Sequence, residues 1–233
     1  MNGSRVLLVE SDVDLARAIL DALGDEGLVA LWAESGKEGL QLARTYDPRL
    51  IALEAQLPDQ DGCEICRQLR REGFPMPILL LAARGSEWDR VLSAETGADD
   101  WVAKPFDPRN LVSRIRALVR RFAGDLALLP HERCVLFGDV EVDLALMQVF
   151  RQGQTVDLTP TGFRLLCLLV SHPDREFAED ELIRAVWGYD SDLGGGRVLD
   201  ARMRRLQERL EAEPRKPRCL VATADGGYKF ERP

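Results

Sequence analysis

Short apolar runs alternate with amphipathic stretches along the first half of the chain. The apolar runs have the length and composition of buried parallel strands, and they are Val6–Val9, Leu28–Trp32, Leu50–Leu53, Ile78–Leu81 and Asp100–Ala103. The stretches that follow them carry apolar residues at helical spacing, as at Leu111, Ile115 and Leu118. Strand–helix units in this succession predict an α/β domain, a doubly wound five-stranded parallel sheet with helices on both faces.

The pattern changes in the second half. Alternating segments at Val140–Val142 and Gln148–Phe150 predict an antiparallel meander. Three helices are then predicted: one opening at Thr159-Pro160, one over Glu179–Trp187, and one running from after Gly196 to about Leu210. The turn Asp225-Gly226 separates two short apolar runs, which is typical of a hairpin. Helices followed by a hairpin predict an α+β winged helix-turn-helix domain.

These patterns divide the chain into residues 1–121, a linker over 122–133 where the helical pattern breaks, and residues 134–233. No apolar run approaches the roughly 18 residues of a membrane span, and the first strand follows the start without a signal-peptide pattern. We therefore expect a cytoplasmic protein with no membrane partner.

Charge and cysteine content limit the binding partners that the sequence predicts. The net charge of −8 argues against nucleic acid as a general partner, but the segment 197–218 holds eight Arg or Lys residues against four acids. Such a local basic segment suits phosphate binding. Five cysteines do not form a disulfide framework, and we interpret Cys63-x-x-Cys66 as small apolar helix residues rather than half of a zinc site.

Charged residues stand at the ends of three predicted strands. Glu10, Glu54 and Lys104 follow the first, third and fifth apolar runs. Because chemistry in such sheets gathers at the carboxyl ends of strands, these side chains are candidates for one pocket. Two carboxylates and a lysine there could hold a divalent cation or form a buried ion pair.

The chain resembles response regulators of the OmpR/PhoB family over nearly its whole length. The matching motifs of the first half are Val6–Glu10, Leu57-Pro58, Ala83–Gly85, Glu95–Asp100 and Lys104–Phe106. Those of the second half are Leu158–Leu166, Val186–Gly188, Arg197–Leu206 and Gly226–Phe230. The resemblance implies a flavodoxin-like receiver, phosphorylated on an aspartate by a sensor kinase with Mg²⁺ held by neighbouring carboxylates, and a winged helix that binds DNA.

The departures from the family pattern fall in the phosphorylation pocket. Glu54 takes the place of the acceptor aspartate, Ser11 takes the place of the second acid although Asp12 stands beside it, and Ala82 replaces the usual hydroxyl residue. The aromatic switch position is Trp101, while Glu10 and Lys104 keep the family's residue types.

These changes oppose the usual phosphate cycle. Glu54 reaches one methylene further than aspartate, Ser11 removes an anionic metal ligand, and Ala82 cannot bond a phosphoryl oxygen. We expect no catalytic residues, no cofactor and phosphorylation-independent activity. Either Glu54 reaches Lys104 and holds the domain near its active state, or the pocket is inert. The alternative is phosphorylation of Glu54 with Mg²⁺ bound by Glu10, Asp12 and Glu54.

The resemblance also implies a symmetric receiver dimer. By position, Glu95 would pair with Arg116 and Asp100 with Arg114 across the two-fold axis, with Val91 in the apolar part. A third pair is missing because Arg90 meets Asn110. The other interpretation is an ordinary amphipathic helix face.

In the winged helix, the resemblance assigns roles along the third helix. Arg197 and Arg204 look like phosphate binders, Arg205 and Ala201 like base readers, and Arg202 fits either role. Trp187 could donate its indole N–H to a phosphate or belong to the core. The wing turn carries Asp225, which disfavours minor-groove insertion, while Lys229 could contact the DNA backbone.

The sequence thus predicts a transcription regulator that binds double-stranded DNA as a homodimer and is not an enzyme. RNA polymerase is a candidate partner, and a sensor kinase is left open. The rival functions are a receiver that still accepts phosphate, and an adaptor that binds a polymerase subunit instead of DNA.

Overall fold

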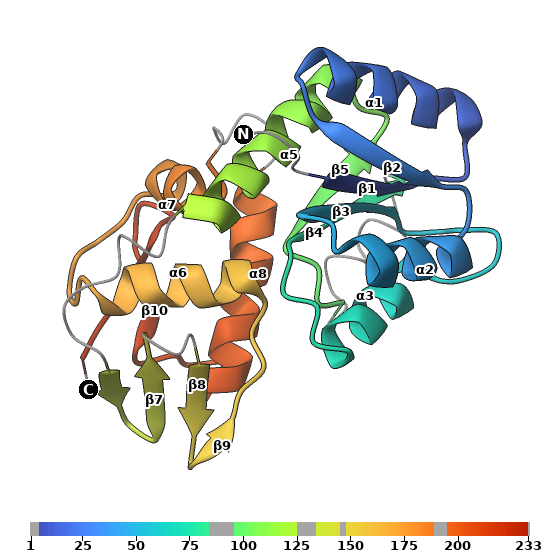
Figure 1. Cartoon of the computed structure of the whole chain (residues 1–233). Coiled ribbons are helices and arrows are strands. Elements are labelled where there is room, and N and C mark those ends of the chain that lie inside the picture. The colour runs from blue at the N-terminus through green and yellow to red at the C-terminus, as the bar shows by residue number, and fades with distance from the viewer. Residues whose placement is uncertain (1–4, 84–95, 125–133, 145–147, 189–194, 233) are drawn as a thin grey trace. The chain divides into compact units, whose positions relative to one another are not determined.

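The computed structural model describes residues 5–83, 96–124, 134–144, 148–188 and 195–232. The chain forms two compact units, Met1–Ala123 and Gly124–Pro233 (Figure 1). Helix α5 runs to Gly124, past the predicted boundary at residue 121, and most of the predicted linker lies outside the described residues.

The first unit is built on a five-stranded parallel sheet with the strand order β2-β1-β3-β4-β5. Its strands are β1 (Arg5–Val9), β2 (Val29–Ala33), β3 (Leu50–Glu54), β4 (Ile78–Ala83) and β5 (Asp100–Lys104). Its helices are α1 (Val13–Asp25), α2 (Gly36–Tyr46), α3 (Gly62–Arg71) and α5 (Pro108–Gly124). Helices α1 and α5 cover one face and α2 and α3 the other, which confirms the predicted doubly wound fold (Figure 1). The predicted helical segment around Val91 lies outside the described residues.

Polar caps fix where helices α1 and α3 of this unit begin. Asp12 accepts hydrogen bonds from the backbone N–H groups of Asp14 and Leu15 at the start of α1, and Asp61 accepts one from Cys63 at the start of α3. A cap satisfies N–H groups that have no partner inside the helix. Because these caps lie at the carboxyl end of β1 and near that of β3, they also fix the loops around the candidate pocket.

The second unit joins a four-stranded antiparallel sheet to three helices and a hairpin. The sheet contains β6 (Cys134–Phe137), β7 (Val140–Asp143), β8 (Gln148–Arg151) and β9 (Gln154–Thr155). The helices are α6 (Pro160–Val170), α7 (Glu179–Val186) and α8 (Gly195–Leu210), and the hairpin pairs β10 (Leu220–Ala222) with β11 (Tyr228–Phe230). This arrangement confirms the predicted meander and winged helix-turn-helix, including Thr159 as the cap of α6.

Backbone contacts hold the hairpin to the helices of its unit. Phe177, just before α7, exchanges two backbone hydrogen bonds with Tyr228 on β11. Gly227 lies so close that an added Cβ would be 1.9 Å from the carbonyl oxygen of Phe177, so only glycine fits there. At the end of α8, the buried carboxylate of Glu211 accepts the backbone N–H groups of residues 218, 219 and 220.

All cysteines carry free thiols. Cys63 and Cys66 are buried in α3, as predicted for small apolar helix residues, and burial raises the pKa of the Cys66 thiol. Among the described residues, no helix has the length and hydropathy that a membrane span requires.

Candidate functional site

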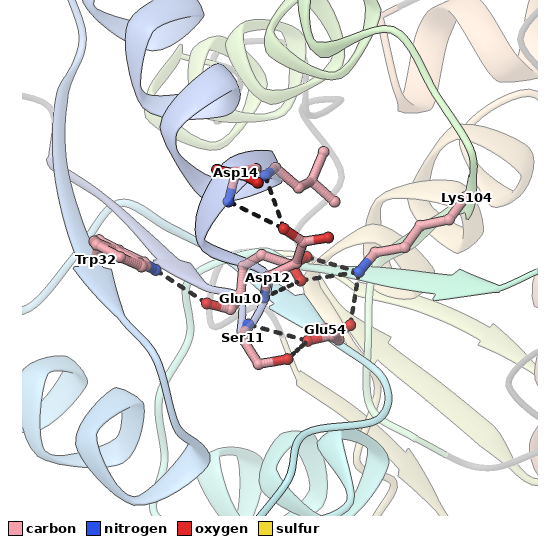
Figure 2. Close-up of polar contacts among 8 residues, drawn as sticks. Glu10, Ser11, Asp12, Asp14, Trp32, Glu54 and Lys104 are labelled. Atoms are coloured by element: carbon pink, nitrogen blue, oxygen red, sulfur yellow. Dashed lines mark hydrogen bonds and ion pairs between the residues drawn. The ribbon is translucent and has the colours of Figure 1, made fainter.

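The sheet order brings the predicted pocket residues together at one edge. Strands β1 and β3 are neighbours, so Glu10 and Glu54, at or just beyond their ends, lie side by side. Lys104 ends β5, two strands from β3, and its long side chain extends across to both carboxylates (Figure 2). Residues far apart in the sequence therefore meet as the strand pattern predicts.

The Lys104 ammonium group lies between the two carboxylates. Its Nζ is 2.6 Å from Oε1 of Glu54, and 3.0 Å and 2.8 Å from the two oxygens of Glu10. The Glu10 side chain is fully buried, while those of Lys104 and Glu54 are 21% and 15% exposed. Buried charges need opposite charges and hydrogen bonds in place of water. Lys104 thus allows two carboxylates to share one pocket.

Ser11 holds the other oxygen of Glu54. Its backbone N–H and its hydroxyl both donate to Oε2 of Glu54, at 3.1 Å and 2.7 Å (Figure 2). The sequence predicted only the loss of an acid at this position, not the gain of a hydrogen-bond donor. The sequence feature that could have predicted this contact is the length of the Glu54 side chain, which reaches the space that an acid at position 11 would fill.

The Asp12 carboxylate caps a helix instead of serving as a metal ligand. One of its carboxylate oxygens caps helix α1, and its own backbone N–H donates to Glu10 at 3.2 Å. Within the described part of the chain, no three acidic, histidine or cysteine side chains gather in a way that could hold a metal ion. The Mg²⁺ site implied by the family resemblance does not fit this donor set, because an ammonium group lies between the two remaining carboxylates.

Burial raises the pKa of both carboxyl groups and Lys104 lowers it, and the net shifts of Glu10 and Glu54 have opposite signs. Burial raises the pKa of Glu10 from its usual 4.5 to about 7, although Lys104 opposes this shift. Burial acts in the same direction on Glu54, but hydrogen bonds from Lys104 and Ser11 outweigh it and lower the pKa of Glu54. Burial likewise opposes the charge of Lys104, yet its bonds to both carboxylates raise the pKa of this lysine. The pocket therefore favours a negative charge on Glu54, paired with Lys104, over one on Glu10.

Replacing Glu10 by glutamine tests this division. A carboxyl whose pKa is raised on folding binds protons more tightly in the folded state, so its contribution to stability falls as pH rises from about 4.5 to about 7. The wild type should therefore lose stability relative to Glu10→Gln across that window and keep a constant difference above it. Calorimetric melting between pH about 4 and about 8 measures the difference. Parallel curves for the two proteins would contradict the assignment.

The remaining pocket positions are apolar. Ala82 on β4 is fully buried and offers only a methyl group, and Trp101 on β5 is 1% exposed. Sequence reasoning missed Gly62, where an added Cβ would be 2.2 Å from the carbonyl oxygen of Glu54. It also missed Trp32, whose indole N–H donates to the carbonyl oxygen of Glu10 at 3.0 Å. An indole in a strand carries no sequence signal that distinguishes this role from core packing.

Residues of the predicted dimer face form ion pairs within the single chain. Asp100 pairs with Arg114 of its own chain at 3.1 Å, and both side chains are nearly fully buried. Within the single chain this is an internal ion pair, and pairing of the two residues across a two-fold axis stays a prediction. Arg116 is half exposed and pairs with Glu26. Its expected partner Glu95 lies outside the described residues, as do Arg90 and Val91.

Helix α8 presents most of the predicted DNA-binding residues to solvent. Arg197 and Arg204 are exposed, and Ala201 and Arg205 are partly exposed. The predicted core residues on the opposite side are buried: Val198, Met203, Leu206 and Leu210. The helix thus has the division of faces that a recognition helix needs.

Two predicted DNA contacts are corrected. Arg202 is only 2% exposed, and its guanidinium donates to the hydroxyl of Thr159, the cap of α6, at 2.8 Å. The reason is helical geometry, since Arg202 follows Val198 by four positions and so shares its buried face. Trp187 is fully buried, which selects the core role over a phosphate contact.

The wing combines acidic and basic side chains. Asp225 is exposed in its turn, and the Lys229 ammonium lies 2.8 Å from Glu231 and 3.3 Å from Glu176. The hydroxyl of Tyr228 donates to Asp200 on α8, which links the wing to the helix. These carboxylates weaken the case for Lys229 as a contact of the DNA backbone.

Comparisons with known proteins agree with both units. Residues 6–116 match the family described as response regulator receiver domain, and residues 153–230 match the family transcriptional regulatory protein, C terminal. The chain is 33% identical to the alkaline phosphatase synthesis transcriptional regulatory protein PhoP of Bacillus subtilis, covering 99% of this chain and 98% of PhoP. It is 36% identical to the DNA-binding response regulator MtrA of Mycolicibacterium smegmatis, covering 98% of this chain and 97% of MtrA.

A solved structure extends the likeness to the fold. The structure of a mutant of the protein RitR matches with a TM-score of 0.77 and 23% identity, over 99% of this chain and 100% of that one. At this identity the match supports the architecture alone.

Proposed function

Because the chain belongs to the OmpR/PhoB family of DNA-binding response regulators, we propose that it regulates transcription as a DNA-binding dimer, in the cytoplasm, without phosphorylation of its receiver. The family supplies the DNA-binding function. The contacts in the receiver pocket support the departure from the phosphate cycle.

A single arrangement carries this proposal: both oxygens of Glu54 are engaged within the protein. Lys104 binds one at 2.6 Å, and Ser11 donates to the other. A phosphoryl acceptor must present a free carboxylate oxygen in line with the donor, beside a cation that neutralises the phosphoryl charge. Glu54 would have to give up its ion pair to react, and the residues around it do not suit Mg²⁺.

The same ion pair supports constitutive signalling. In the family cycle implied by the resemblance, the lysine would meet a negatively charged phosphoryl group, and here Glu54 brings a fixed negative charge to Lys104 instead. Such a permanent contact can shift a two-state receiver toward one conformation without a modification. We therefore assign the Glu54–Lys104 pair to the task of holding the receiver in its DNA-binding state.

Incubation with acetyl phosphate tests the proposal. Intact-mass analysis of the wild type should show no phosphoryl adduct, with or without Mg²⁺. The matched control is the variant Ser11→Asp/Ala82→Thr/Glu54→Asp, which restores the replaced groups and should gain one phosphoryl group in Mg²⁺. An adduct mapped to Glu54 of the wild type would overturn the proposal.

The dimer is proposed on a smaller face than the resemblance implies. Arg116 on α5 belongs to the expected set and is half exposed although it pairs with Glu26, whereas Arg114 is buried in its pair with Asp100. Exposed ion pairs contribute roughly 0–1 kcal/mol each, so they would set the register of the two copies rather than the affinity. Sedimentation of the full chain with operator DNA measures the stoichiometry, and one chain per site would refute the dimer.

A further inference from the structure

The Glu54 carboxylate accepts hydrogen bonds from donors in two distant parts of the chain. The Lys104 ammonium meets Oε1, and the backbone N–H and hydroxyl of Ser11 both meet Oε2. One oxygen is thus bound by a cation and the other by two neutral donors. Both oxygens of the planar carboxylate thus have hydrogen-bond donors, and one of these donors is charged.

The position of Ser11 is fixed by its neighbours on both sides. Glu10 before it is fully buried at the end of β1, with its carbonyl oxygen held by the Trp32 indole. Asp12 after it caps α1 and donates its own N–H to Glu10. The backbone N–H of Ser11 is therefore held in place by contacts that do not involve Glu54. A carboxylate at position 11 would instead bring a second anion toward Oε2, which lies 2.7 Å from the present hydroxyl oxygen.

We propose that Ser11 is a positioning residue and that Ser11 and Lys104 form a receptor for one small carboxylate, which the Glu54 side chain fills as a tethered anion. This deepens the proposed function, on which it rests, by naming what holds the Glu54 carboxylate in place. In the wild type the receptor is occupied from within. Removing the Glu54 carboxylate should leave a site for a free carboxylate of the size of acetate.

Chemical rescue of the full-length Glu54→Ala variant tests the receptor. The alanine methyl group and a bound acetate together supply nearly all atoms of the lost side chain. Acetate should raise the melting temperature of the variant above that in chloride of equal ionic strength, because a ligand of the folded state stabilises it by mass action. It should also slow hydrogen exchange of the residue 11 amide. The wild type should show neither effect.

Matched variants separate positioning by Ser11 from a general effect of salt. Glu54→Ala/Ser11→Thr keeps the hydroxyl and should keep the rescue. Glu54→Ala/Ser11→Ala loses one hydrogen bond and should bind acetate about tenfold more weakly. Glu54→Gln fills the site with an amide whose single oxygen can face either Lys104 or Ser11 but not both, so it should block acetate and show no rescue.

The outcomes distinguish this inference from the function on which it rests. Equal rescue with alanine and threonine at position 11 overturns the role of Ser11, and no rescue of a folded Glu54→Ala variant overturns the receptor. If that variant does not fold, a pKa of the Glu54 carboxyl that does not rise in Ser11→Ala, measured by NMR titration, overturns the positioning role. A phosphoryl adduct on wild-type Glu54 would instead overturn the proposed function, whatever acetate does.

Discussion

Replacing Lys104 by methionine should lower the free energy of unfolding of the receiver unit by about 3–5 kcal/mol at pH about 8. The substitution keeps most of the side-chain volume and removes the charge. It leaves Glu10, which is fully buried, and Glu54, which is 15% exposed, as like charges in one pocket. Removing one partner of a buried ion pair costs far more than the pair itself contributes, because the remaining charge keeps its desolvation penalty.

The loss should depend on pH in a direction that identifies its cause. Without Lys104, both carboxyl groups should have raised pKa values in the folded state, so the folded protein should bind more protons than the unfolded one. The variant should therefore recover stability as the pH falls. Native-state hydrogen exchange of the β1 and β3 amides reports this unit by itself.

A charge-free pocket provides the control. The triple variant Lys104→Met/Glu10→Gln/Glu54→Gln removes both stranded carboxylates and should regain most of the lost stability. If the single variant loses less than about 1 kcal/mol, the pocket is more hydrated than its burial implies. That result would also weaken the assignment of Glu54–Lys104 as the contact that holds the receiver in one state.

The meeting of Glu10, Glu54 and Lys104 could be predicted because it depends only on strand order. Apolar runs mark the strands, and the carboxyl ends of parallel strands share one edge of the sheet. The partners of each oxygen could not be predicted, because they depend on side-chain rotamers and on the loop after β1. The sequence therefore showed only that Ser11 replaces an acid, and its two hydrogen bonds to Glu54 are seen only in the structure.

The errors in the second unit have a different origin. The family resemblance assigned Arg202 to the DNA face, although its position four residues after Val198 places it on the buried side of α8. A buried guanidinium is tolerated when oxygen acceptors receive its N–H groups, and the Thr159 hydroxyl is one such acceptor. The spacing from Val198 would have indicated the buried face, and the prediction did not use it.

Arg205 and Arg204 should differ in how their loss affects DNA binding. Arg205→Ala should cost about 1–3 kcal/mol on the selected operator and little on unrelated DNA, since a base-reading arginine contributes to discrimination. Arg204→Ala should weaken binding to all sequences alike and reduce the salt dependence by about one counterion. Gel shifts across a salt series, with DNA selected from genomic fragments by the wild type, measure both effects.

A matched control separates these roles from loss of positive charge. Arg17 on α1 is exposed and lies outside the basic segment 197–218, so Arg17→Ala removes an equal charge and should change operator affinity by less than Arg204→Ala. Wild-type affinity in both helix variants would refute the assignment of α8 as the reading helix. If the wild type itself shows no salt-dependent shift, the adaptor function gains support. The carboxylates beside Lys229 in the wing would then be part of a protein-binding surface rather than a weakness in a DNA-binding one.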